Sequence, residues 1–238
     1  YEIHYYTCSQ LDFAGIFAEY QWDNIGFYFL IKILQMIFGY NFHGFLFILA
    51  IFEGIVLARI IYKYSVNPYM SFLLYMALGY YVFIYSGLKQ ALATAFIYLA
   101  FDAIIERKKI RFIIFVALAV SVHLPAFIFA PAYYIAYKKL NVKMIGVYII
   151  SAIGIYMFKE QIFIYMTDIY ESVVSTTQIG GVGEKVLMML AFLIAGYLLR
   201  VPDGENEVYS ATFNIIVVAT LLQLFAIYGN VFERLADY

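Results

Sequence analysis

Three cationic side chains, Lys89, His123 and Arg234, lie at the edges or breaks of apolar stretches of the chain. A cation in such a place can stabilise negative charge that develops on a reacting group. Carboxylates that could accept a proton lie upstream, at Asp12 and Asp23, in a segment without lysine or arginine. These two kinds of group together would form an active site, provided that the fold brings them to one place.

The composition is incompatible with a soluble globular protein. Hydrophobic residues make up 65% of the 238 positions and charged residues only 13%, and the mean hydropathy is +0.84. An ordinary soluble domain carries about a quarter charged residues. The chain is therefore predicted to be an all-α, polytopic membrane bundle, because a helix satisfies its own backbone hydrogen bonds in lipid.

Six apolar stretches are long enough to be membrane-spanning helices of a single transmembrane domain. A bilayer core of about 30 Å requires roughly 20 apolar residues in a helix. The predicted spans are 44–62, 69–87, 89–106, 142–158, 184–199 and 210–229. Two further stretches do not fit as simple spans, because Lys32 interrupts 25–40 while His123 and Pro125 interrupt 110–137.

Basic residues orient this bundle, because cytoplasmic loops are enriched in lysine and arginine. The basic clusters are Arg107–Arg111, Lys138 and Lys139 with Lys143, Arg59 with Lys63, and Arg200. Placing these clusters on the cytoplasmic side of the membrane puts residues 1–43 on its outer side. The stretch 25–40 then becomes an amphipathic helix on the outer surface. The stretch 110–137 becomes a hairpin of two short helices with His123 near its apex.

Polar residues inside or next to apolar stretches are further candidate site residues. Lys89 and Gln90 stand at the start of a predicted span, and His123 and Arg234 face the same outer side. Glu53 lies within the first predicted span, where an acid is costly and often functional. It either contributes to function or pairs with a buried partner that holds the bundle together.

Several candidates also have a structural interpretation. Lys89 would extend its ammonium group to the membrane interface from a helix end. His123 would cap the hairpin or form a structural hydrogen bond. Asp12 and Asp23 would be solvated acids on an outer loop. Both interpretations stay open for each residue.

A metal or cofactor is not expected. Cys8 is the only cysteine, so the chain forms no internal disulfide and no cysteine-based metal site. The three histidines, His4, His43 and His123, and the acidic residues show no metal-ligand spacing. The sequence therefore predicts chemistry that is independent of metal.

Three short motifs occur in a characteristic order. Residues 87–93 (GLKQALA) open a predicted helix, a basic run follows at 107–111, and residues 122–126 read VHLPA. This order resembles the EpsG-like exopolysaccharide polymerases, in which an Arg-Gln-x-x-Ala helix start precedes a basic loop and a Phe-His-x-Ser-Ala motif. Residues 24–27 (NIGF) are similar to the family's Glu-x-Gly-Tyr/Phe element.

The resemblance extends along the whole chain, with some departures. Gly180 and Gly181, which free the backbone to approach a ligand, fall where a related feature is expected, as does the C-terminal segment around Arg234. Lys89 stands where arginine is usual, and Asn24 stands where glutamate is usual. The family's first and last helices would lie beyond the two ends of this chain.

The resemblance implies a GT-C-like membrane glycosyltransferase. Such an enzyme moves a growing glycan from a polyprenyl (undecaprenyl) diphosphate onto a sugar hydroxyl of a second lipid-linked repeat unit, building an exopolysaccharide or capsule. In the implied catalytic group, Lys89 and His123 stabilise the negative charge of the leaving diphosphate, and Asp12 or Asp23 accepts the proton of the acceptor hydroxyl group. The implied substrate-binding residues are Gln90, Arg234, Asn24, Gly180, Gly181 and Glu53.

The resemblance also implies a location and partners. The chain would cross the bacterial plasma (inner) membrane several times, with its active site facing outward. Its partners would be lipid-linked donor and acceptor oligosaccharides, membrane lipids, and a chain-length regulator or flippase of the same pathway, with no nucleic acid. A glycan ligase, a membrane O-acyltransferase and a polysaccharide transporter or flippase remain alternatives.

Overall fold

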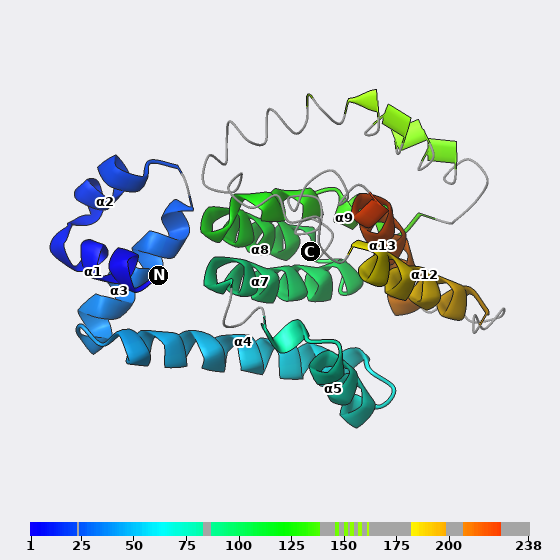
Figure 1. The fold of residues 1–238 in the computed structure, drawn as a ribbon, viewed down its shortest axis with the longest axis horizontal. Helices are drawn as coiled ribbons and strands as arrows, with labels where there is room; N and C mark the ends of the chain where they lie inside the picture. The colour runs from blue at the N-terminus through cyan, green and yellow to red at the C-terminus, as the bar shows by residue number, and fades with distance from the viewer. Residues whose placement is uncertain are drawn as a thin grey trace. The chain divides into compact units, whose positions relative to one another are not determined.

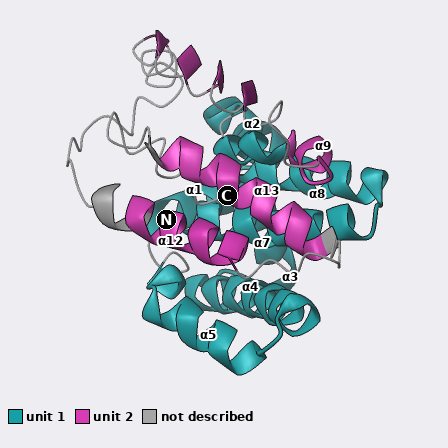
Figure 2. Cartoon of the chain, turned by 90° about the vertical axis from the view of Figure 1, so that its right-hand side faces the viewer, with its two compact units in different colours: residues 1–130 teal, residues 131–238 magenta. Residues whose placement is uncertain are grey.

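The computed structural model describes residues 1–22, 24–82, 87–138, 182–198 and 207–224, with isolated positions between 146 and 161. Throughout these residues the regular structure is helical, and they contain no strand, which confirms the all-α prediction (Figure 1). The chain divides into two compact units, residues 1–130 and residues 131–238 (Figure 2). The prediction of a single transmembrane domain stays a prediction.

Three helices form the start of the first unit: α1 (Glu2–Gln10), α2 (Phe13–Tyr20) and α3 (Ile25–Phe38). Asp12 begins α2, because its Oδ1 accepts a hydrogen bond from the Gly15 N–H at 2.7 Å and so satisfies a free donor of the first turn. Both α1 and α2 pack on α3.

Lys32 joins α3 to α1. Its Nζ donates to the main-chain oxygens of Cys8 and Ser9, at 3.2 and 3.4 Å. These carbonyls lie in the last turn of α1, where the helix dipole favours a cation and where oxygens lack helical partners. The lysine that interrupts the apolar stretch is therefore a C-terminal cap for another helix.

The exposed face of α3 is apolar. Lys32 is the only charged residue of the helix, and Gln35 is buried, with its Nε2 donating to the Tyr5 main-chain oxygen at 2.7 Å. The large exposed side chains are Ile33, Met36, Ile37 and Phe38. The polar side chains Lys32 and Gln35 thus turn toward α1, and the face of α3 away from them is apolar. Its position as an amphipathic helix on the outer surface stays a prediction.

Within the described part of the chain, two helices are long and apolar enough to cross a membrane. They are α4 (Phe42–Tyr64) and α7 (Leu88–Ile105), which overlap the predicted spans 44–62 and 89–106. The most apolar window of α7 is 56% buried and that of α4 is 22% buried, so α7 is the more central helix. The large exposed side chains of α4 are Phe47, Ile51, Ile55 and Tyr62.

The predicted span 69–87 is not one continuous helix. α5 (Pro68–Ala77) is followed by Gly79 and by the short 3-10 helix η1 (Tyr80–Val82). Gly79 has φ of 76°, a left-handed conformation that ends helices and favours glycine. Whether this stretch crosses a membrane stays a prediction.

The apolar stretch after the basic cluster breaks at His123. α8 (Lys109–Val122) packs along α7 and ends there, and the 3-10 helix η2 (Leu124–Phe129) follows with Pro125 in its first turn. Proline lacks the N–H that would continue the α-helix, which accounts for the break. The arrangement of the second leg as a hairpin stays a prediction, because residue 131 begins the other unit.

Helices α3 and α8 approach each other closely at Gly26. A Cβ at this glycine would lie 2.8 Å from Ser121 Cβ and 2.9 Å from the Ser121 carbonyl carbon. Such distances are sterically forbidden, and the second partner is main chain that cannot rotate away. A glycine at this position is therefore required for the first turn of α3 to meet the end of α8.

A buried carboxylate joins the C-terminal ends of α4 and α7. Asp102 is 2% exposed and accepts hydrogen bonds from Arg59 Nη2 at 3.0 Å, from Lys63 Nζ and from the Tyr64 hydroxyl. One turn later, Glu106 extends the network through its own ion pair with Lys63 at 2.7 Å. Three donors compensate the charge of Asp102, as a buried carboxylate requires.

Basic residues of the next segment complete this network. Lys108 Nζ and Arg111 Nη1 lie 2.8 and 2.9 Å from Glu106 Oε2. Four of the basic residues that orient the chain in the sequence-based topology, Arg59, Lys63, Lys108 and Arg111, are thus held together at one end of the α4–α7 pair. We call the group of Arg59, Lys63, Asp102, Glu106, Lys108 and Arg111 the charge cluster.

The second unit contains α9 (Ala132–Ile135), α12 (Val182–Leu198) and α13 (Glu207–Leu224). α12 and α13 pack together and overlap the predicted spans 184–199 and 210–229. Asn214 on α13 donates through Nδ2 to three main-chain oxygens at the end of α9, those of Ile135, Ala136 and Lys138. Most of the predicted span 142–158 lies outside the described residues.

Replacing Asp102 with asparagine should lower the free energy of unfolding by about 1.5–3 kcal/mol, because three donors lose a charged, buried acceptor. Glu106→Gln should cost less, because the Glu106 side chain is 25% exposed against 3% for Asp102. Thermal unfolding of both variants in detergent, followed by the fluorescence of Trp22, shows which variant loses more stability. Equal melting temperatures for both variants and the wild type would show that the cluster does not hold α4 to α7.

Replacing Gly26 with alanine should destabilise the protein by about 1–3 kcal/mol through overpacking against Ser121. Gly54→Ala on α4 is the matched control, because a Cβ there meets nothing within 4 Å and alanine favours a helix. The same unfolding measurement compares the two. A Gly26 variant as stable as the Gly54 variant would contradict the close approach of α3 and α8.

Candidate active site

Lys89, at the start of α7, lies against the first turn of α3. Its Nζ donates a hydrogen bond to the Tyr28 hydroxyl at 2.7 Å. The same ammonium group lies 4.5 Å from the centre of the Tyr28 ring and 5.7 Å from that of Phe27, within the range of a cation–π interaction. The lysine is therefore positioned by aromatic side chains of α3 and is half-buried.

Asn24 connects this turn to the helix break at His123. It is 6% exposed and has φ of 54°, a left-handed conformation that asparagine tolerates. Its Oδ1 accepts a hydrogen bond from the Leu124 N–H at 3.1 Å. The start of α3 is thus fastened to the residue that directly follows His123.

His123 is the residue between α8 and η2. Its main-chain N–H donates to the Ala119 oxygen at 2.8 Å, and its own oxygen accepts from the Ala126 N–H at 3.0 Å. The backbone is extended, with φ of −151°, so the chain changes direction at this residue. The first turn of α3 thus contacts Lys89 through Tyr28, and the preceding residue, Asn24, contacts the residue after His123.

An aromatic group that the sequence analysis missed surrounds Lys89. Tyr20 stacks on Tyr28 with ring centres 3.5 Å apart and an interplanar angle of 12°. His4 lies edge-on to both rings at 5.7 Å, and its Nδ1 is 3.2 Å from the Tyr20 hydroxyl. Burial raises the pKa of Tyr20, so the phenol stays neutral at physiological pH. The only sequence signal was that Tyr28 lies two residues beyond Gly26.

Gln90 follows Lys89 and is 8% exposed, on a face of α7 that is otherwise lined by small apolar residues. Its main-chain oxygen accepts a hydrogen bond from the Thr94 hydroxyl at 2.9 Å. The structure thus places Gln90 inside the bundle, next to the lysine of the candidate site.

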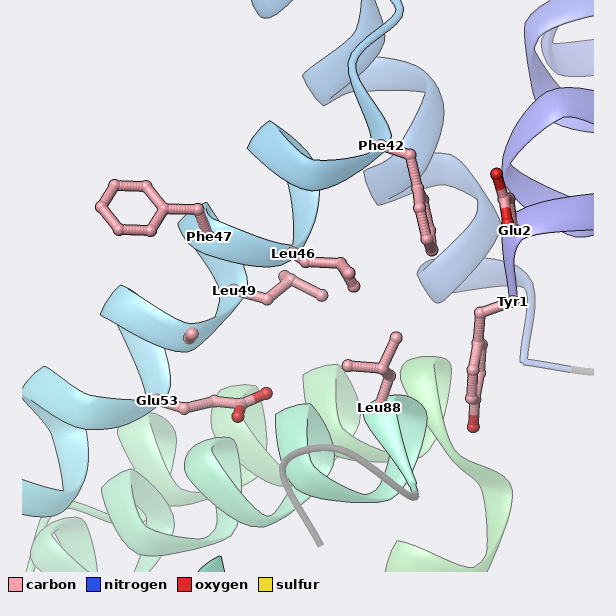
Figure 3. A pocket seen from close by; sticks show the side chains of 9 residues that line it. Tyr1, Glu2, Phe42, Leu46, Phe47, Leu49, Glu53 and Leu88 are labelled. Carbon is pink, nitrogen blue, oxygen red and sulfur yellow. The ribbon is translucent and has the colours of Figure 1, made fainter. Parts of the chain in front are cut away.

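Glu53 lies on the buried stripe of α4 and faces a pocket of about 540 Å³. Figure 3 shows its carboxyl group pointing from α4 into the space toward Leu88. The side chain is 6% exposed, and neither carboxyl oxygen has a hydrogen-bond partner in the described part of the chain. Residues of α1 and α4 complete the lining, among them Tyr1, Phe42, Leu46 and Leu49.

Other predicted site residues are not brought to this place. Asp12 is exposed, and its carboxylate is used as the N-cap of α2. Asp23, Gly180, Gly181 and Arg234 lie outside the described residues. The predicted roles of these four residues stay predictions.

The described residues contain no group of three or more His, Cys, Asp or Glu side chains that could hold a metal ion. Cys8 is fully buried in α1, and burial raises the pKa of its thiol to about 11, so it is a poor nucleophile. The chemistry that these residues support is electrostatic: a half-buried ammonium group attracts an anion more strongly than one in bulk water.

A family model matches the chain over residues 1–238, and it describes the EpsG family. No match was found among curated proteins or among solved structures. The two long apolar helices and the family together indicate a membrane protein whose function is related to exopolysaccharide polymerisation. The chain belongs to the EpsG family, that of the EpsG-like exopolysaccharide polymerases.

Proposed function

We propose that this protein is a membrane glycosyltransferase that joins polyprenyl-diphosphate-linked oligosaccharide repeat units into a surface polysaccharide. The reaction forms a bond between a sugar hydroxyl of the acceptor unit and the anomeric carbon of the donor glycan. The bond from that carbon to the diphosphate oxygen breaks, and polyprenyl diphosphate leaves. Because the leaving group is already a diphosphate, the protein mainly positions both substrates and stabilises negative charge.

The observation that carries this proposal is the placement of Lys89. A half-buried ammonium group, fixed by the Tyr28 hydroxyl and by two aromatic rings, is a suitable site for the leaving diphosphate. His123 borders the same turn of α3 through the Asn24 hydrogen bond and is the second group that would contact the substrate. Both belong to the motifs that carry the family resemblance.

The charge cluster supports action on the outer face. It lies at the C-terminal end of α7, whereas Lys89 lies at the N-terminal end, and 13 residues between Lys89 and Asp102 correspond to about 20 Å of helix. Basic residues favour the cytoplasmic side of a membrane. If the charge cluster is cytoplasmic, Lys89 and His123 are near the outer surface.

Lys89→Ala should reduce polymer formation by roughly 10²–10³-fold, the usual effect of removing one group that stabilises transition-state charge. Lys89→Arg should retain much of the activity, because positive charge is kept. Lys138→Ala, at an exposed lysine of the other unit, is the control. The measurement is the length profile of surface glycan from cells that carry each full-length variant, with membrane abundance checked. Wild-type chain length in Lys89→Ala would remove this lysine from the site.

His123→Ala should cause single lipid-linked repeat units to accumulate while long chains disappear, because the units arrive but are not joined. His43→Ala is the control, since His43 is an exposed histidine in the first turn of α4. Extraction of lipid-linked oligosaccharides, followed by mass spectrometry, measures the single units and the long chains in each variant. Long chains that persist in His123→Ala would show that His123 has a structural role. An absence of repeat units from the outer face of the membrane would favour a transporter.

A further inference from the structure

The pocket beside α4 reaches the start of α7, next to the proposed site of the leaving group. Leu88 lines the pocket and directly precedes Lys89. Tyr1 also lines it, as Figure 3 shows. The Tyr1 ring lies edge-on to Phe27, with centres 6.0 Å apart, and the Lys89 ammonium group lies 5.7 Å from the centre of the Phe27 ring. A molecule in this pocket would therefore adjoin an anion held by Lys89.

The pocket is lined mainly by apolar side chains, and the carboxyl group of Glu53 is directed into it. The aromatic rings of Tyr1 and Phe42 line it together with aliphatic side chains of α4. The volume of about 540 Å³ is within the range of pockets that bind small ligands, roughly 300–1,000 Å³. Along α4, Phe42 and Glu53 are about 16 Å apart, so the lining extends from the first turn of the helix to the carboxyl group.

The buried carboxyl group of Glu53 has no hydrogen-bond partner among the described residues. A carboxyl group removed from water requires hydrogen bonds or a cation, as Asp102 receives from three donors. Neither oxygen of Glu53 has such a partner in the described ranges, although the residue is only 6% exposed. Its carboxyl group points into the pocket, where a ligand would supply the missing partner.

The other described carboxylates of the first unit are occupied or exposed. Asp12 accepts the N-cap hydrogen bond of α2, and Asp102 and Glu106 belong to the charge cluster. Glu2 and Glu19 are exposed. Among the described residues of the first unit, Glu53 is thus the acid that combines burial, a carboxyl group without a hydrogen-bond partner and a pocket next to the start of α7.

We propose that this pocket receives the acceptor sugar and that Glu53 accepts the proton of its attacking hydroxyl group. The inference rests on the proposed polymerase function. In this step the acceptor oxygen bonds to the donor's anomeric carbon while its proton passes to a carboxylate oxygen of Glu53. The bond to the diphosphate breaks, and Lys89 stabilises the anion. Glu53 then returns the proton to water.

The test uses the full-length protein in membranes with lipid-linked repeat units as substrate. Glu53→Gln keeps the shape of the side chain but not its basicity, and it should slow chain elongation by roughly 10²–10⁴-fold, the usual contribution of a general base. Glu19→Gln, at an exposed acid of α2 that does not line the pocket, is the matched control and should elongate normally. Elongation by Glu53→Gln at the wild-type rate would overturn the inference and leave the proposed polymerase function intact.

A second measurement avoids dependence on the folding of the variant. Dicyclohexylcarbodiimide, an apolar reagent that modifies protonated buried carboxyl groups, should label Glu53 in the wild-type protein, with the site identified by mass spectrometry. Labelling should abolish elongation in proportion to its extent, and acceptor units should protect the residue. Full activity after complete labelling of Glu53 would contradict its role. Failure of unlabelled wild-type protein to elongate any unit would instead contradict the proposed function.

Discussion

The first turn of α3 can occupy its place only because residue 26 has no side chain. At Gly26 the backbone of α3 lies so near Ser121 that a Cβ would come within 2.9 Å of the main chain of α8. This contact brings Asn24 to the N–H of Leu124 and sets Tyr28 against Lys89. Three segments that are far apart in the sequence meet because two helices touch without an intervening side chain.

Two buried carboxyl groups of the α4–α7 pair differ in their hydrogen-bond partners. At one end, the charge of Asp102 is compensated by Arg59, Lys63 and Tyr64, so the carboxylate is stable although it is almost fully buried. Glu53, nearly three turns earlier than Lys63 on α4, receives no such compensation from the described residues. A buried ion pair makes the structure more rigid, whereas a buried acid without a partner lowers stability. We propose that Glu53 is kept despite this cost because it binds a ligand.

Local features of the fold were predictable from the sequence. The lengths of α4 and α7 follow from continuous apolar runs, and the end of α8 follows from Pro125 beside His123. The all-α fold follows from the same patterns. The break within the stretch 69–87 has a visible signal in Gly79, but a hydropathy window averages over a single glycine.

The roles of individual polar residues were less predictable, because each depends on a contact distant in the chain or on a competing local role. Lys32 caps α1, 23 or more residues away, and Asp102 meets α4 across 38 or more positions. The matching spacing of Arg59 and Lys63 with Asp102 and Glu106, four residues apart on both helices, was a signal that could have identified the charge cluster. Asp12 was a candidate base, but an aspartate before an apolar helix is also a usual N-cap.

The central claim is that the chain joins lipid-linked sugars at a site between Lys89 and the helix break at His123. The most direct measurement places the purified full-length protein in liposomes with polyprenyl-diphosphate-linked repeat units and no other protein. The account predicts a ladder of glycan lengths, with one polyprenyl diphosphate released for each linkage formed. Units that stay single, or that cross the bilayer without being joined while the protein remains folded, would contradict it.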